Sequence, residues 1–269
     1  MQILSDTFQV TEYINNWKER PADQINNLFQ VFIETPTPNN RFQSNSGYPN
    51  QWSRILGIDY GNVSSQLVSA FQDLNTPISM HLAVVANRFT VIWSSGSDAN
   101  LTYYGVDPVN GGRILDIQDA PTRNADHAHR GISIELRNQL AYNWLVSPYT
   151  VSDLFHTLTF PDYLTDTSQR RRIRNTGEQC LVRAHSYPIL GGNRAILKEL
   201  ADHGHISNAS FIRIRFGVNP SDKFLDKDLF TLIVELIPNN AQGEPNEATA
   251  NFLDFVGACP PCPQPASQQ

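Results

Sequence analysis

The chain has 269 residues, 40% of them hydrophobic, and a formal net charge of −6, which fits one large or two medium-sized globular domains. The acidic balance argues against general binding of nucleic acids or anionic membranes, because both need clustered positive charge. No apolar run approaches the roughly 18 residues that a transmembrane helix needs, so we expect no membrane span.

The first residues and the cysteine content indicate the cellular compartment. Residues 1–10 carry Asp6 but no Lys or Arg, and they lack the apolar core of a secretory signal. Three cysteines are too few for a disulfide framework in a chain of this length. We therefore expect a cytoplasmic protein with reduced thiols.

Helices are predicted at the start of the chain. Residues 8–20 form a short helical pattern, and residues 22–34 form the clearest amphipathic helix, with apolar side chains spaced i, i+3, i+4, i+7, i+8. These side chains are Ile25, Leu28, Phe29, Phe32 and Ile33. We expect one or two helical turns at 51–56, a connection at 57–62 and another helix at 64–74.

Strands are predicted next. Residues 78–86 and 89–94 are rich in β-branched and large apolar residues and flank a tight turn, so they predict a β-hairpin. Two further short strands are expected at 101–106 and 113–117.

The second half follows a polar joint at residues 119–130. A helix is predicted from apolar side chains that recur every four residues, namely Ile132, Leu136, Leu140 and Trp144. Thr150 and Asp153 have the spacing of a capping box and predict a second helix as far as Leu158. A short strand is expected at 181–185.

The most regular pattern precedes the C-terminal tail. A helix is predicted at 193–203, which Asn193 caps and Gly204 ends. Three strands follow the helix, at 211–218, 229–237 and 250–256. The first of these strands alternates arginines with apolar residues. The second is almost entirely apolar, which is typical of a strand buried on both faces.

Together these elements predict an α+β fold with two subdomains, each made of helices followed by a small, mainly antiparallel sheet. The predicted parts are subdomain 1–118, joint 119–130, subdomain 131–258 and a Pro/Cys tail at 259–269. The halves share short matches in the same order. These matches are Asn16-Trp17 and Leu28-Phe29 in the first half, and Asn143-Trp144 and Leu154-Phe155 in the second. Internal duplication is one hypothesis, and chance similarity is the other.

Two Asp-His-x-His sequences are candidate metal ligands, because imidazole and carboxylate together bind zinc and other transition metals. Their histidines are His127 and His129 in the joint, and His203 and His205 after the last predicted helix. The alternative interpretation is structural. The second pair favours a helix C-terminus, where histidine interacts well with the helix dipole, and the first pair is simply exposed.

An arginine cluster is a candidate anion-binding site for phosphate or nucleic acid, with a solvated polar loop as the alternative. It contains Arg170, Arg171, Arg172 and Arg174. In the tail, Cys259 and Cys262 have the C-x-x-C spacing of redox and zinc sites. The following prolines instead favour an extended cap over the last strand.

The last quarter of the chain contains the strings SFIRIRFGVN, LFTLIVELIPN and ANFLDFVGACPPCP. This segment resembles the end of a group of uncharacterised bacterial proteins that finish in a P-C-P-x-x-C string after a short α/β unit. The tail here is C-P-P-C-P instead. The resemblance implies a bacterial, intracellular origin and carries no activity with it.

The sequence contains no P-loop, G-x-S-x-G, G-x-G-x-x-G or H-E-x-x-H motif. We therefore expect a binding or assembly component with a protein partner or self-association, and no cofactor. The alternative hypothesis is a metal-dependent or other hydrolase with its site at the seam between the two halves, because pockets favour domain interfaces.

Overall fold

A computed structural model gives the fold of most of the chain. It describes residues 1–32, 52–97, 100–105, 112–116, 119, 131–147, 151, 154, 156–158, 181–183, 186–207, 210–219 and 229–256. The α+β class is confirmed, with two five-stranded antiparallel sheets and helices on their faces. Among these residues, no helix is long and apolar enough to cross a membrane.

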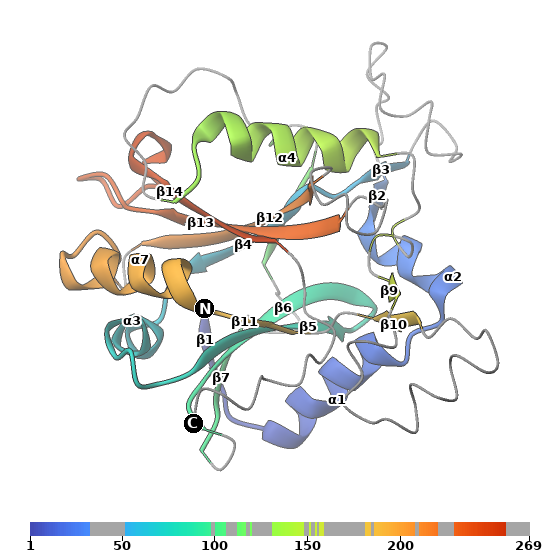
Figure 1. Cartoon of the computed structure of the whole chain (residues 1–269), viewed down its shortest axis with the longest axis horizontal. Helices are drawn as coiled ribbons and strands as arrows, with labels where there is room; N and C mark the ends of the chain where they lie inside the picture. Colours follow the sequence, from blue (N-terminus) through green and yellow to red (C-terminus); the bar gives the residue numbers. More distant parts are fainter. Residues whose placement is uncertain are drawn as a thin grey trace.

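The architecture has four layers, seen edge-on in Figure 1: helix α1, sheet I, sheet II and helix α4. Sheet I has the order β1 (Gln2–Leu4), β7 (Thr102–Gly105), β6 (Arg88–Ser95), β5 (Ile78–Val85) and β11 (Ser186–Pro188). Sheet II has the order β14 (Asn251–Val256), β13 (Leu229–Ile237), β12 (Phe211–Asn219), β4 (Gly57–Asn62) and β8 (Arg113–Leu115).

The helices and short ribbons complete these layers. The helices are α1 (Thr7–Lys18), α2 (Ala22–Ile25), α3 (Ser65–Gln72), α4 (Ile134–Val146) and α7 (Gly191–Asp202), with 3₁₀ turns η1 (Asn26–Phe29) and η5 (Glu247–Thr249). Two-stranded ribbons pair β2 (Gln30–Phe32) with β3 (Trp52–Arg54), and β9 (His156–Leu158) with β10 (Leu181–Arg183). Helices α3 and α7 pack against each other at one end of the sheets (Figure 1).

Each outer helix buries apolar residues on the sheet below it. On sheet I, Val10 and Ile14 of α1 cluster with Ala83 and Ile92. On sheet II, Leu140 of α4 belongs to a cluster with Ile134, Ile233, Ile237, Ala250 and Phe252. Gly217 permits this close approach, because a Cβ there would lie 2.8 Å from the Thr231 methyl carbon and 3.1 Å from the Leu140 Cβ.

The inner faces of both sheets share one core, and Phe29 lies at its aromatic centre. Its ring centroid is 6.2 Å from Trp17, 4.4 Å from Phe89, 5.6 Å from Trp144, 5.3 Å from Phe216 and 6.5 Å from Phe230. These rings come from both halves of the chain. Residues far apart in sequence are therefore tied to one side chain on a short 3₁₀ turn.

The predicted helix at 22–34 is wrong beyond its first turns. The chain forms α2, then η1, and then the strand β2. The run Val31-Phe32-Ile33 has the β-branched and aromatic residues that strands favour, and pairing with β3 satisfies the backbone. The apolar spacing of Ile25, Leu28 and Phe29 therefore records burial in the core rather than one continuous helix.

Residues 51–62 were also predicted wrongly, because they contain the strands β3 and β4 instead of a helical turn and a connection. In β4, Ile58 and Tyr60 enter the core while Asp59 between them pairs with an arginine. This alternation is a strand signal. Glycines at both Gly57 and Gly61 weaken it in the sequence, because glycine is depleted in strands.

Three details of the second half differ from expectation. Leu136 is 44% exposed, because α4 turns Ile134, Arg137 and Leu140 toward the sheet instead. The helix predicted as far as Leu158 gives way to β9, where the backbone pairs with β10. Asn193 does not cap α7, which begins at Gly191.

Other sequence predictions are confirmed, with ends shifted by up to two residues. Helix α3 and strands β5, β6, β7, β8, β10, β12, β13 and β14 form where the patterns placed them. Gly204 follows α7 with a φ of +69°, the left-handed conformation in which glycine ends a helix.

The subdomain boundary at 119–130 does not separate the two sheets. Strand β4, from the first half, pairs with β12 in sheet II, and β11, from the second half, pairs with β5 in sheet I. Segments 1–118 and 131–258 therefore each contribute strands to both sheets, and the predicted division into two subdomains stays a prediction. The ladder hydrogen bonds of β5 and β12 need a neighbour that only the other half supplies.

We predict that Phe29→Ala lowers the free energy of unfolding by about 3–5 kcal/mol, because it leaves a cavity among five aromatic rings. Phe8→Ala is the matched control. Phe8 is 80% exposed and Phe29 is 0% exposed, so the control should change stability little. Urea unfolding followed by circular dichroism measures both. Equal effects of the two substitutions would contradict this account of the core.

Candidate functional site

Two of the four histidines predicted as metal ligands, His203 and His205, are among the described residues and lie at the end of α7. His203 and His205 are exposed, and their ring centroids are 6.3 Å apart. The His203 Nδ1 is 2.8 Å from the Glu199 carbonyl oxygen, one helical turn earlier, so this ring is engaged at the helix end. Within the described part of the chain, no group of three or more His, Cys, Asp or Glu side chains could hold a metal ion.

The remaining sequence candidates lie outside the described residues. They are His127 and His129, the arginines Arg170, Arg171, Arg172 and Arg174, and the tail cysteines Cys259 and Cys262. Metal binding by the two Asp-His-x-His pairs therefore stays a prediction.

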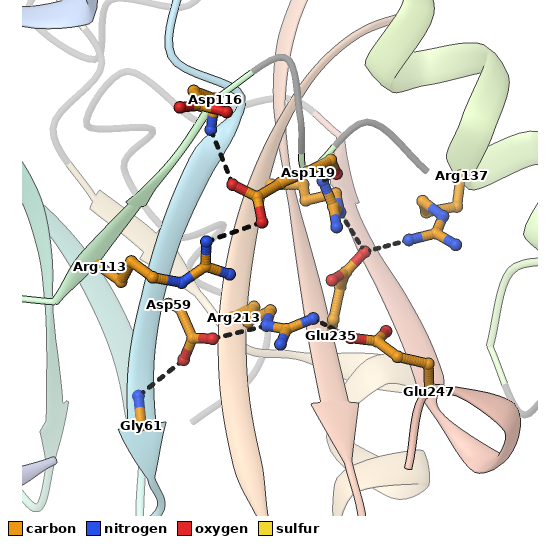
Figure 2. Close-up of polar contacts among 10 residues, drawn as sticks. Asp59, Gly61, Arg113, Asp116, Asp119, Arg137, Arg213, Glu235 and Glu247 are labelled. Carbon is orange, nitrogen blue, oxygen red and sulfur yellow. Dashed lines mark hydrogen bonds and ion pairs between the residues drawn. The ribbon is translucent and has the colours of Figure 1, made fainter. Parts of the chain in front are cut away.

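Among the residues that the structure describes, charged side chains gather on the outer face of sheet II, beside helix α4 (Figure 2). We call this group the arginine–carboxylate cluster. Its arginines are Arg113, Arg137, Arg213 and Arg215, and its carboxylates are Asp59, Asp119, Glu235 and Glu247. The members come from β4, β8, β12, β13, α4 and η5, and from the segment at residue 119.

Glu235 is the buried centre of this cluster. Its Oε1 accepts a hydrogen bond from Arg137 Nη1 at 2.5 Å and another from Arg215 Nε at 2.6 Å. The side chain of Glu235 is 0% exposed, and both arginine side chains are nearly as buried. Arg215 also donates to the Asp119 carbonyl oxygen at 2.8 Å, and the Arg137 guanidinium lies 4.4 Å from the Phe252 ring centroid.

A second group of ion pairs extends toward the edge of sheet II. Arg213 donates through Nε to Asp59 Oδ2 at 2.7 Å and through Nη1 to Glu247. The other Asp59 oxygen accepts from the Gly61 backbone amide at 2.9 Å. At the strand edge, Arg113 Nη1 donates to Asp119 at 2.7 Å. Figure 2 shows these contacts running from β4 across β12 to the 3₁₀ turn at Glu247.

The charges of the cluster hold one another ionised. Burial acts to raise the pKa of Glu235, but the charges of Arg215 and Arg137 outweigh it, and the pKa lies below its ordinary value. Burial lowers the pKa of Arg137, partly offset by Glu235. The innermost trio carries two guanidinium charges against one carboxylate, so its formal charge is +1.

The geometry gives the cluster a positioning role. An arginine stays protonated at any physiological pH, and Glu235 stays ionised, so neither exchanges a proton near pH 7. Glu235 Oε2 and Arg137 Nε are buried without a hydrogen-bond partner among the described residues. The cluster fixes α4, β12 and β13 relative to one another through charges that do not titrate near neutrality.

A serine–histidine pair lies at the other outer face. His81 Nε2 and Ser94 Oγ are 2.8 Å apart on the neighbouring strands β5 and β6, a distance at which histidine activates serine in many hydrolases. Ser94 is 3% exposed, so its oxygen is not offered to a substrate in this structure. The arrangement is that of a cross-strand polar pair that satisfies a buried hydroxyl.

The sequence contains a signal for the buried part of the arginine–carboxylate cluster. Arg213 and Arg215 alternate with apolar residues, and Glu235 is the one charged residue in a strand that is apolar apart from Thr231. A buried carboxylate needs a cationic partner, and arginines at alternate positions of a neighbouring strand supply it. The partners Asp59, Arg137 and Glu247 are far away in sequence and come together only in the fold.

Comparisons with known protein families, with curated proteins and with solved structures find no match for this chain.

We predict that Glu235→Gln destabilises the protein by about 3–5 kcal/mol, because it leaves two buried guanidinium groups without a counter-charge. Asp202→Asn is the control, since Asp202 pairs with Lys198 on an exposed helix face and should contribute less than about 1 kcal/mol. Urea midpoints at pH 7 compare the two. A loss for Glu235→Gln no larger than that for Asp202→Asn would refute the assignment.

We predict that the ionised form of Glu235 stabilises the fold and that the ionised form of Asp254 destabilises it. Because the folded-state pKa of Glu235 lies below the ordinary 4.5, its stabilisation is present above that value and is lost as the pH falls. Burial raises the pKa of Asp254 above the ordinary 3.8, despite a hydrogen bond from Thr231, so ionised Asp254 is destabilising at pH 7.

The measurement is the unfolding free energy of Glu235→Gln and Asp254→Asn from pH 7 down to about pH 3. The loss of unfolding free energy that Glu235→Gln causes relative to wild type should become smaller below about pH 4. Any increase in unfolding free energy that Asp254→Asn gives should also become smaller as the pH falls. A Glu235→Gln deficit that stays constant across this range would contradict the ionised state of Glu235.

Proposed function

We propose that the protein is a binding or assembly component that associates with a second copy of itself through the exposed edge of sheet I. The observation that supports this is an apolar N-terminal corner. Ile3, on the edge strand β1, is 44% exposed, and Phe8, in the first turn of α1, is 80% exposed. Exposed aromatic and aliphatic side chains at a sheet edge are typical of interaction surfaces.

The position of β1 favours a second copy as the partner. β1 is the last strand of sheet I, so one of its backbone edges faces no other described strand. Such an edge is a template for another strand. Two identical strands that pair antiparallel are related by a twofold axis, so both copies use the same surface in the contact. The apolar corner of one copy is then buried against the apolar corner of the other.

The arginine–carboxylate cluster agrees with a role in binding. Its described charges pair with one another across β4, β12, β13 and α4, so this cluster supports a rigid scaffold. The scaffold presents the N-terminal corner on a fixed sheet, because Met1 is also anchored through its ammonium group to the carbonyl oxygens of Tyr60 and Asn62.

We predict that the wild-type mass measured by size-exclusion chromatography with light scattering rises from monomer toward dimer as the protein concentration increases. The double variant Ile3→Thr/Phe8→Ser should remain a monomer at the same concentrations. Its melting temperature should equal that of the wild type at dilutions where the wild type is itself a monomer, because both side chains are exposed in the single chain. The control is Leu74→Ser/Leu190→Ser, which removes two other exposed apolar residues and should behave as wild type.

A wild-type protein that is monomeric at every concentration would overturn the proposed function. Dimerisation that survives in the Ile3/Phe8 variant would overturn the assigned surface.

A further inference from the structure

Within the described residues, the two halves of the chain share a run of elements in the same order. In the first half this run is α1, β2, β3, β4, α3 and the three strands β5, β6 and β7, with β1 before it, α2 and η1 between α1 and β2, and β8 after it. The second half runs α4, β9, β10, β11, α7 and the three strands β12, β13 and β14. In both, the ribbon is antiparallel and the last three strands form an antiparallel meander.

In each half, the strand that precedes helix α3 or α7 joins the sheet formed by the last three strands of the other half. β4 pairs with β12, the first meander strand of the second half, and β11 pairs with β5, the first meander strand of the first half. Helices α3 and α7, which follow the crossing strands, pack against each other. The exchange is therefore reciprocal, and α3 and α7 lie beside each other at one end of the two sheets (Figure 1).

The two crossings can be aligned over three residue pairs each. Antiparallel to β12, residues 57, 58 and 59 face Arg215, Ile214 and Arg213. Antiparallel to β5, residues 186, 187 and 188 face His81, Met80 and Ser79. His81 and Arg215 are thus at equivalent positions, and so are Ser94 and Glu235, which face Ser79 and Arg213 in their meanders.

This equivalence explains why each sheet has a polar pair beside its outer helix. The His81–Ser94 contact in sheet I and the Arg215–Glu235 ion pair in sheet II join the same two positions. The helices also sit on equivalent residues. α1 packs on Ala83, two residues beyond His81, and on Ile92, directly opposite His81. α4 packs at Gly217, two residues beyond Arg215, and on Ile233, directly opposite Arg215.

We propose that the chain is a duplicated unit folded as an intramolecular, strand-exchanged pair. The β5 edge that receives β11 and the β12 edge that receives β4 are then one and the same binding surface, and its partner is a second copy of the unit. This inference does not depend on the proposed function. It predicts that the two halves bind each other as separate chains, and that both crossings contribute alike.

The experiment uses the full chain with a protease site inserted within residues 120–130. After cleavage, the nicked protein should remain one particle with the mass of the whole chain and the same circular dichroism spectrum. The two fragments are then separated in guanidinium chloride and refolded alone or together. The equimolar mixture should recover the native spectrum and cooperative melting, whereas neither fragment alone should give a folded monomer.

Proline and alanine substitutions at one position of each crossing test their equivalence. Ile58 faces Ile214, and Tyr187 faces Met80. Phe216 N donates to Leu56 O, and Ile189 N donates to Ile78 O. Hydrogen-bonded pairs recur at every second residue of an antiparallel ladder, so Ile58 and Tyr187, each two residues from one of these bonds, are hydrogen-bonded positions. Proline removes the backbone donor and alanine keeps it. Relative to alanine, proline should weaken fragment association on the order of 100-fold at each position.

Three results would overturn the proposal. The first is a fragment that folds as a monomer and ignores the other fragment. The second is a mixture that does not recover the native spectrum. The third is a proline effect confined to Ile58 or confined to Tyr187, because equivalent crossings must respond alike. Loss of self-association through Ile3 and Phe8 leaves all three results unaffected, so the two proposals fail independently.

Discussion

Each sheet needs a strand from the opposite side of the joint, and the rest of the structure depends on this exchange. Strand β4 supplies sheet II with the neighbour of β12, and β11 supplies sheet I with the neighbour of β5. The inner faces then close on one core, in which Phe29 contacts Trp17 and Trp144 from the two outer helices. Because ladder hydrogen bonds and core burial are both shared, the halves cannot be stable in isolation without losing one or the other.

The buried charges add a second constraint, which acts on register. Moving a carboxylate into a protein interior costs several kcal/mol, and only well-placed cations offset that cost. Glu235 meets this condition with Arg137 and Arg215. A slip of β12 by one residue would turn its arginines into the apolar core and leave Glu235 unpaired. The ion pairs thus penalise alternative pairings of β12 with β13, and the His81–Ser94 hydrogen bond in sheet I penalises alternative pairings of β5 with β6 in the same way.

The sequence was informative where local pattern and tertiary role agree. The hairpin β5–β6 and the strand β13 were predicted because their apolar runs match strands that are buried in the fold. Prediction failed at residues 22–34, where helical spacing reflected core burial of Phe29 and its neighbours. It also failed for the cluster, because Glu235 and Arg137 are 98 residues apart and no local spacing connects them. Long-range pairing decides both cases, and a single sequence does not encode it in neighbouring residues.

The position of the two proposed binding surfaces in sheet I limits how they can interact. In the order β1-β7-β6-β5-β11, the exchanged strand β11 closes one end and β1 lies at the other. Internal pairing therefore uses the β5 edge and leaves the β1 edge, with Ile3 on it, for a different chain. The same logic separates stability from association. Changes at the crossings act on folding because they remove ladder bonds inside the core, whereas changes at an exposed edge act on binding because the folded state buries little there.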